Sequence, residues 1–395
     1  MNSSSRNTLL YVISWLTDFS VLLLVFTVSR DLAEEGASLL KMGIVGGGIS
    51  LAHAASSFIF GHISDRFGRR RLILAGIITL LLSAIGCLFL MRDSSPYFLA
   101  YWSAGLGSGL IYPPLIAWLN EGQRTDLRSK GISRVIIRFC IAWNAGLICG
   151  QLGGGWLFPF GRHYPMALAA ILSVLSMTCL LFTGRRSSKP HQLETKQSDL
   201  DLATKSASLV FTKIAWISNF GSTFSVSIIL HLFPKLTVSL DIPSGHHGMI
   251  LASMRGFVIV SYLLMHRASF WQYRFSVILC VGAIAICGLL GLVFVQGELG
   301  LTCALIGFAV YAGFNYFSSL YYSSTGRPDQ TRGFASGVHE ATLGFGLGAG
   351  AICGGALGQT AGIRSPYILA AGVIVILTLI QVLYYIRKVN SAMNC

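Results

Sequence analysis

The sequence has little charge for its length. Only 11% of its 395 residues are Asp, Glu, Lys or Arg, whereas soluble domains contain about 25%. Acidic residues are the scarcer kind, with 15 against 29 basic ones, which gives a formal net charge of +14. This composition excludes an ordinary soluble domain. The basic residues stand in short turns between apolar runs and are not interleaved with aromatic residues, so the positive charge does not predict nucleic-acid binding.

The signatures of common enzyme sites are also missing. The sequence has no CxxC pair, no glycine-rich loop for nucleotide phosphates and no hydrolase nucleophile elbow. Of its nine cysteines, all but Cys395 lie inside apolar runs, which is typical of small buried residues. We therefore predict a protein that is not an enzyme, with no cofactor, no metal site and no ATP-driven pumping by this chain alone.

Long apolar runs are what the sequence does contain. Hydrophobic residues make up 53% of the chain, and they gather in runs of roughly 20 residues, the length that a helix needs to cross a bilayer. The first run contains Asp18 and no cleavage site follows it, so we expect a span rather than a signal peptide. The twelve predicted spans are residues 8–29, 42–61, 72–91, 97–119, 133–157, 164–183, 208–232, 248–266, 275–295, 299–322, 333–357 and 365–386.

A polar, charged stretch at residues 184–207 separates the first six spans from the last six. It contains Pro190 and predicts a flexible cytoplasmic linker between an N-terminal six-helix bundle, residues 1–183, and a C-terminal one, residues 208–395. With both termini cytoplasmic, the cytoplasmic segments carry most of the 29 lysines and arginines. By the positive-inside rule, this favours a multi-pass protein of the plasma (inner) membrane in that orientation.

The two halves resemble each other in sequence. Residues 15–19, WLTDF, recur as residues 216–220, WISNF, and a series of glycines in the fifth span recurs in the eleventh, each at a separation of about 200 residues. Coincidence in a glycine-rich chain is the alternative, but the common separation favours duplication of six helices in the same orientation. The recurring glycines are Gly146, Gly150 and Gly154, then Gly346, Gly350 and Gly354.

A short basic motif follows the second run, and its spacing is uncommon. It closely resembles the loop between transmembrane helices 2 and 3 of the major facilitator superfamily (MFS) of secondary transporters. In that family the loop is a cytoplasmic latch that helps to hold the outward-open state. The resemblance implies this role for Gly61, Asp65, Arg66, Gly68, Arg69 and Arg70. Glu121, at the cytoplasmic end of the fourth span, is a candidate partner for a latch arginine.

The resemblance also implies the architecture. The expected fold is an all-α membrane protein with twelve transmembrane helices in two parallel-repeat six-helix bundles, and the substrate site lies between the bundles near the midplane. The sequence departs from the family pattern at two positions. Tyr101 stands where many family members have an arginine in span 4, and Gln151 replaces the proline of an antiporter signature in span 5.

Ionisable residues inside spans point to a polar interior, because such groups usually face protein or water rather than lipid. They are absent from the interiors of spans 3, 6, 9 and 12, which we expect on the outside of the bundle. Internal ion pairing or hydrogen bonding is the alternative to a role in transport for each of them. The candidates are Asp18, His53, Arg138, Arg255, His339 and Glu340.

Asp18 is the strongest candidate for a substrate or proton site. It lies ten residues into span 1, about 15 Å deep, and a carboxylate there can take up and release a proton. Asn219 is its counterpart in the second half, and we expect the pair to face each other across the cavity. His339 and Glu340 are adjacent, so at most one of them faces the cavity squarely. Further polar or aromatic lining candidates are Asn144, Asn315, Tyr112 and Tyr311.

The sequence therefore predicts a secondary transporter, a symporter or an antiporter, that moves a small-molecule solute by alternating access. Protons are a hypothetical coupling ion, the lipid bilayer is the other partner, and we expect a monomer. The alternative is a transporter-like membrane receptor or scaffold that binds a ligand without net flux. The two departures from the family pattern leave that alternative open.

Overall fold

A computed structural model describes residues 3–92, 94–119, 130–183, 202–324 and 329–393. Within these ranges the side chains of residues 3–4, 61–66, 130–133, 202–207, 324, 329–338, 341 and 389–393 are not described. All statements on structure below refer to the described residues.

The described part of the chain folds into twelve long α-helices, which confirms the number predicted from the apolar runs. A short helix, α8, follows α7, and a 3-10 turn, η1, follows α5. The elements are α1 (Ser3–Glu34), α2 (Leu39–Phe67), α3 (Arg69–Phe89), α4 (Ser95–Leu119), α5 (Lys130–Leu157), η1 (Phe158–Phe160), α6 (His163–Leu181), α7 (Leu202–His231), α8 (Phe233–Ser239), α9 (Ser244–Arg267), α10 (Phe275–Phe294), α11 (Glu298–Ser324), α12 (Asp329–Ala361) and α13 (Ser365–Met393).

Ten of these helices are long and apolar enough to cross a membrane by length and composition. The other two long helices are α4 and α12, which are rich in glycine and, in α4, contain Pro113 and Pro114. Glycine, proline and serine lower the mean hydropathy of a helix without adding charge. Both helices lie between apolar neighbours in the bundle, so they need less apolar surface of their own.

The helices without ionisable residues in their interiors lie on the outside, as the sequence predicts. In the most apolar segments of α3, α6, α10 and α13, 28–44% of the residues are buried inside the protein, against 50–78% in the other candidate spans. Their exposed residues are large and apolar, such as Leu82 in α3 and Leu379 in α13. These surfaces can face acyl chains at no electrostatic cost.

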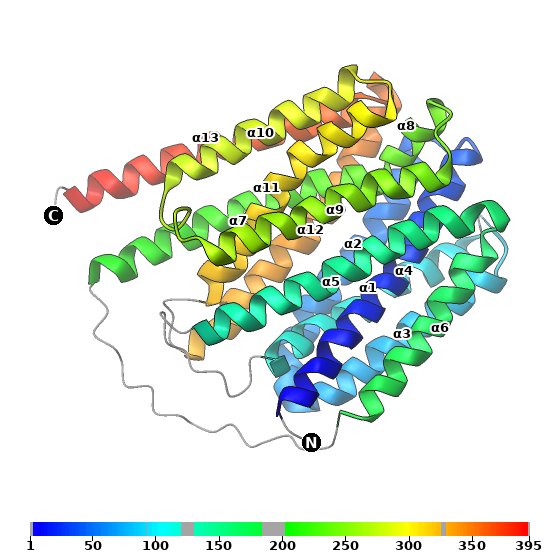
Figure 1. The fold of residues 1–395 in the computed structure, drawn as a ribbon, viewed down its shortest axis with the longest axis horizontal. Helices are drawn as coiled ribbons and strands as arrows, with labels where there is room; N and C mark the ends of the chain where they lie inside the picture. The colour runs from blue at the N-terminus through cyan, green and yellow to red at the C-terminus, as the bar shows by residue number, and fades with distance from the viewer. Residues whose placement is uncertain (1–2, 93, 120–129, 184–201, 325–328, 394–395) are drawn as a thin grey trace.

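The first six long helices and the last six pack in the same way. In the first half α1 packs on α5 and α6, and α3 packs on α4 and α6; in the second half α7 packs on α12 and α13, and α10 packs on α11 and α13. Figure 1 shows α1 to α6 in the lower part of the view and α10, α11 and α13 in the upper part.

Glycines set the closeness of the equivalent pairs α1–α5 and α7–α12. A Cβ added at Gly150 would lie 2.9 Å from the carbonyl oxygen of Phe19, and one added at Gly346 would lie 2.8 Å from that of Phe220. Phe19 and Phe220 are counterparts in the sequence repeat. In both pairs a glycine of the second helix faces a backbone carbonyl oxygen of the first, which close helix packing in membranes requires. The contacts are one helical turn out of register with the sequence repeat, because the counterpart of Gly150 is Gly350, which faces the carbonyl oxygen of Phe224.

Two helix pairs make most of the contact between the halves. They are α2 with α12 and α5 with α9. At one end of the second pair, the hydroxyl of Ser244 donates to the carbonyl oxygen of Gly155 at 3.0 Å.

Arg30, in the last turns of α1, ties the halves together at the same end of the bundle. Its guanidinium donates to Thr237 Oγ1 of α8 at 3.2 Å and to the carbonyl oxygen of Ile242 at 3.0 Å. It also donates to Glu34 of its own helix at 2.7 Å. Arg30 is only 5% exposed, so these charge-assisted bonds are shielded from water.

Aromatic and histidine contacts complete this junction. Ser29 Oγ lies 3.4 Å from His231 Nδ1 of α7, and the Phe26 and His247 rings lie 4.8 Å apart. Both histidines are buried. We call the contacts of Phe26, Ser29 and Arg30 with the second half the closed end; it lies at the end of α1 remote from the N-terminus.

The basic turn between α2 and α3 is centred on Gly68, which has a φ of 87°. Apart from Gly68 and its two chain neighbours, no described atom lies within 4 Å of the position that a Cβ would take there. The glycine is therefore required by the backbone conformation and not by space.

We predict that Gly68→Ala destabilises the protein by about 1–3 kcal/mol, the usual cost of holding a side chain in a disfavoured backbone region. Thermal unfolding of the purified protein in detergent would measure this. Gly256→Ala is the matched control, because Gly256 also has no atom near its Cβ position but lies inside helix α9. Equal melting temperatures for the two variants would contradict the prediction.

We predict that Arg30→Gln opens the closed end, because both hydrogen bonds from its guanidinium to the second half are lost. Hydrogen bonds to charged groups are worth about 1.5–3 kcal/mol each, enough to change the populations of two conformations. Spin labels at the exposed residues Ser38 and Ser239 would report longer distances. Glu34→Gln, which removes only the contact within α1, should leave the distance distribution unchanged.

Candidate functional site

Buried polar side chains gather where the two halves face each other, roughly midway along the helices. They come from α1, α2, α4 and α5 of the first half and from α9, α11 and α12 of the second. We call this group the central polar cluster. Its members are Asp18, His53, Tyr112, Asn144, Arg255, Tyr262, Tyr316, His339 and Glu340.

Asp18 lies at the middle of α1 and is 6% exposed. The Tyr112 hydroxyl of α4 and the charge of Arg255 on α9 are its polar neighbours, but Asp18 Oδ2 and the Tyr112 hydroxyl have no hydrogen-bond partner among the described residues. Arg255 is itself 6% exposed. An unpaired charge is costly to bury, and the opposite charges of the two side chains reduce that cost across the interface.

A second contact between the halves joins His53 of α2 to Glu340 of α12. The distance from His53 Nε2 to Glu340 Oε2 is 3.9 Å. Two serines orient the imidazole: Ser108 Oγ lies 2.9 Å from Nδ1, and Ser57 Oγ lies 3.5 Å from Nε2. The contact becomes an ion pair when His53 is protonated, so its strength depends on one proton.

His339 and Glu340 point in different directions, as adjacent residues on a helix must. Glu340 reaches the first half, whereas His339 Nδ1 lies 2.8 Å from Ser319 Oγ of α11, within the second half. The His339 ring also meets the Tyr316 ring edge-on at 5.2 Å. Glu340 therefore links the halves, while His339 stabilises the α11–α12 pair and holds Tyr316.

Aromatic rings form the other side of the cluster. The rings of Trp143 and Tyr316, one from each half, lie 4.9 Å apart, and Tyr262 lies 6.2 Å from Tyr316. The amide nitrogen of Asn144 donates to the carbonyl oxygen of Cys140 at 3.0 Å and to the Tyr262 hydroxyl at 3.4 Å. The rings offer flat apolar surface beside the charged pairs, which suits a solute with both kinds of group.

Several buried polar atoms of the cluster have no hydrogen-bond partner among the described residues. They include the acceptors Asp18 Oδ2 and Asn144 Oδ1 and the donor Arg255 Nε. Buried polar groups are normally satisfied. The unpartnered atoms of the cluster therefore include both acceptors and donors.

Some predicted site residues lie apart from the cluster. Asn219 is fully buried but donates to Thr342 Oγ1 of α12 at 3.2 Å, inside its own half. No described contact joins it to Asp18. The partner that the structure gives to Asp18 is Arg255, which is not its counterpart in the repeat.

Among the remaining candidates, Tyr311 points away from the cluster, and no described contact joins Arg138 or Asn315 to it. Arg138 is exposed and lies five helical turns from Trp156, which is 58% exposed on the same face of α5. Tyr311 is directed at α7, its hydroxyl 3.5 Å from the Cβ position of Gly221. Asn315, one turn further along α11, is buried within the second half. Tyr316 and not Tyr311 supplies the aromatic contact to the first half.

The predicted latch is described in part. Arg69 donates to the carbonyl oxygen of Ala117 at the end of α4, and Arg70 to that of Leu181 at the end of α6, both at 3.2 Å. Cations at these positions satisfy the free carbonyl groups at helix C-termini. The side chains of Gly61, Asp65 and Arg66, and all of Glu121, lie outside the described residues.

Sequence reasoning missed Tyr262 in the cluster, Trp143 beside it and the two histidines of the closed end. His231 lies within a predicted apolar span, so the signal that identified His53 was available for it as well. Trp143 and Tyr262 gave no such signal, because aromatic residues in spans usually pack against other helices.

Comparison with known proteins gives the family. The Major Facilitator Superfamily model matches residues 8–328. The inner membrane transport protein YajR of Escherichia coli K12 is 24% identical over 332 residues, which cover 82% of this chain and 70% of YajR. Multidrug resistance protein 2 of Bacillus subtilis 168 is 25% identical over 191 residues, covering 47% of this chain and 46% of that protein.

Two solved structures share the fold. The human organic anion transporter MFSD10 (TETRAN) superposes with a TM-score of 0.70 at 14% identity, covering 96% of this chain and 100% of that one. A bacterial homologue of the human lysosomal transporter Spinster, in an inward-facing and occupied conformation, gives a TM-score of 0.69 at 11% identity, with 96% of each chain covered. The chain therefore belongs to the Major Facilitator Superfamily, and it is a multi-pass membrane transporter and not an enzyme.

Proposed function

We propose that this transporter moves a small solute by alternating access. Residues 1–183 and 208–395 act as two rigid bundles joined by a cytoplasmic linker, residues 184–207, and they rock about the central polar cluster. The equivalent packing of α1–α5 and α7–α12 supports two bundles of one kind. Rocking of repeated halves around a midplane site is the general mechanism of such folds.

One observation carries the proposal: ionisable side chains of opposite halves meet in the middle of the protein. Asp18 interacts with Arg255, and His53 lies 3.9 Å from Glu340. Each contact is worth most when its partners are desolvated and close. A solute or proton that binds one partner weakens the contact between the halves, and so links binding to movement.

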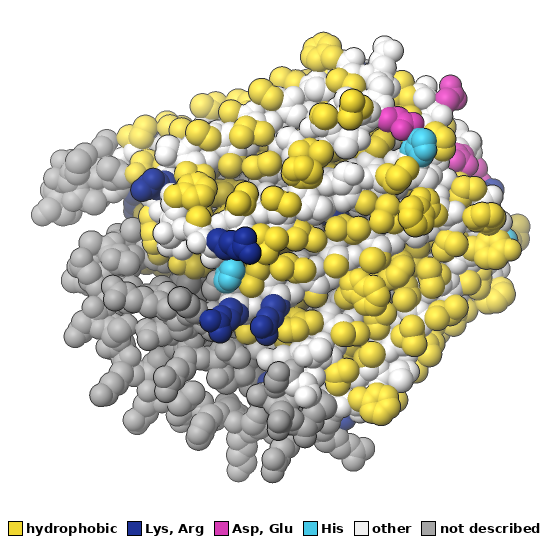
Figure 2. Space-filling view, in the orientation of Figure 1, with side chains coloured by type: hydrophobic (Ala, Val, Ile, Leu, Met, Phe, Trp, Pro, Cys, Tyr) yellow, Lys and Arg dark blue, Asp and Glu magenta, His cyan; other side chains and the backbone are white. Residues whose placement is uncertain are grey.

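We propose that both termini face the cytoplasm of the inner (plasma) membrane. Figure 2 supports this orientation: hydrophobic side chains cover the middle of the visible face, Lys and Arg gather towards the end where the C-terminus lies in Figure 1, and Asp and Glu towards the other. Basic residues favour the cytoplasmic side. The described conformation is then closed to the outside, because the closed end lies opposite the N-terminus.

Asp18 is the proposed proton site. In the described conformation the charge of Arg255 acts on its carboxylate from across the interface. A proton on Asp18 would remove the negative charge of the carboxylate. Arg255 would then be released and could hold an anionic group of the solute. Proton and solute binding would thus be coupled through one buried arginine, without any further carrier.

We predict that Asp18→Asn abolishes transport driven by a pH gradient but preserves solute exchange, because the amide keeps the shape of the carboxyl group and cannot change charge. Proteoliposomes with an imposed pH gradient, and with a solute identified from a compound panel, would test this. A loss of at least tenfold in uphill uptake is expected, with counterflow retained.

Asp241→Asn is the control for that experiment, since Asp241 is exposed in the turn after α8. Unchanged pH-driven uptake in Asp18→Asn would contradict the proposed coupling. Absence of counterflow in the wild-type protein, across the panel, would favour the alternative of a receptor or scaffold without net flux.

We further propose that the basic turn acts as a cytoplasmic latch. The Arg69 side chain already joins α3 to the end of α4. Arg69→Gln should therefore lower the turnover rate several-fold without lowering the amount of protein inserted in the membrane. Arg71, which is exposed, provides the control variant Arg71→Gln. Normal turnover in Arg69→Gln would remove the latch from the mechanism.

A further inference from the structure

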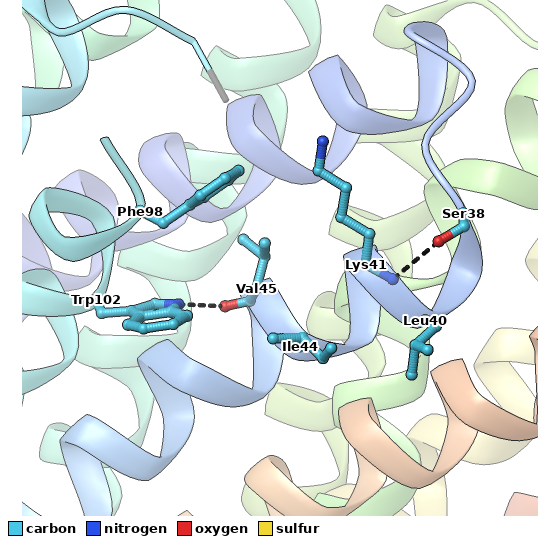
Figure 3. Close-up of a pocket in the computed structure, with 7 residues that line it drawn as sticks. All are labelled: Ser38, Leu40, Lys41, Ile44, Val45, Phe98 and Trp102. Carbon is cyan, nitrogen blue, oxygen red and sulfur yellow. Dashed lines mark hydrogen bonds between the residues drawn. The ribbon is translucent and has the colours of Figure 1, made fainter. Parts of the chain in front are cut away.

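A groove with a volume of about 300 Å³ lies on the surface between the first turns of α2 and of α4. Figure 3 shows Phe98 and Trp102 on one side of it and Ile44 and Leu40 of α2 on the other. None of its lining residues belongs to the central polar cluster or to the closed end. It is therefore a separate feature of the transporter.

The lining of the groove is almost entirely apolar, and the groove opens away from the protein. Ile44 is 47% exposed and Leu40 is 38% exposed, although both belong to a segment that is apolar enough to span the membrane. The indole nitrogen of Trp102 donates to the carbonyl oxygen of Val45 at 2.9 Å, which fixes the ring as a wall. An apolar groove on such a segment faces acyl chains and is a poor site for water.

One cation stands at the rim of this groove. The ammonium group of Lys41, in the first turn of α2, lies 5.9 Å from the centroid of the Phe98 ring. The backbone N–H of Lys41 donates to Ser38 Oγ at 3.2 Å, which holds the turn that carries the lysine. Figure 3 shows the Lys41 side chain extending along the groove on the side of Phe98. The place of Lys41 at the start of an apolar helix, and its positive charge, are those of a lysine at the level of lipid headgroups.

We propose that this groove binds a phospholipid with an anionic headgroup, whose phosphate contacts Lys41 and whose acyl chain lies against Ile44, Val45 and Trp102. Val45 is four residues from Lys41, about 6 Å along the helix, so the groove holds the first carbons of the chain. The membrane supplies such molecules at high local concentration. A lysine beside an apolar groove complements both parts of the lipid at once, which neither a free anion nor a neutral lipid does.

Native mass spectrometry of the full-length protein, with phosphatidylglycerol and phosphatidylcholine of identical chains, would test the proposal. We expect phosphatidylglycerol to bind about five-fold more tightly, the effect of one cation near a lipid surface. Lys41→Gln should abolish this difference and Lys41→Arg should keep it. Lys213→Gln is the matched control, because Lys213 also lies over an aromatic ring, that of Tyr384 at 6.0 Å, but does not line the groove.

Ile44→Trp tests the apolar half of the site while Lys41 stays in place. The larger side chain should fill the groove and weaken binding of both lipids, with an unchanged circular dichroism spectrum. Added inorganic phosphate at millimolar concentration should not displace phosphatidylglycerol. Equal lipid preference in wild type and Lys41→Gln would overturn the proposal, and so would full displacement by phosphate, which would indicate a simple anion site.

Discussion

The cost of burying charge in a membrane protein governs the arrangement of this transporter. Asp18 and Arg255 are each 6% exposed in the middle of the bundle, and each belongs to a different half. Neither half could bury its own member of the pair alone at an acceptable cost. The charge balance of the interior therefore depends on how the two halves meet.

The contacts between the halves are of two kinds, and they lie at different depths. At the closed end Arg30 binds a hydroxyl and a backbone carbonyl, groups that do not change charge near neutral pH. In the middle the contacts join acids to bases, and one base is a histidine. In the proposed mechanism the first kind determines which end is shut, whereas the second responds to protons and solutes.

The two halves are built alike but do not carry the same chemistry. Gly150 packs against the carbonyl oxygen of Phe19 and Gly346 against that of Phe220, so close glycine contacts hold α1 to α5 and α7 to α12 in the same manner. Asp18 and Asn219 occupy equivalent places, yet the acid faces the other half and the amide is bonded to Thr342 within its own. Exchange of one carboxylate for an amide is enough to make a symmetric scaffold asymmetric in charge.

The sequence alone determined the class of the protein, the twelve helices and the helices that lie outside, because the bilayer demands long apolar runs and excludes unpaired charge. It also identified Asp18, His53, Arg255 and Glu340 as interior groups. Only the tertiary structure decided which of them meet. The direction of a side chain around a helix, and the helix it faces, depend on packing between segments that are far apart in the chain. For that reason the influence of the Arg255 charge on Asp18, the exposed position of Arg138 and the closed end at Arg30 became visible only once the helices were assembled.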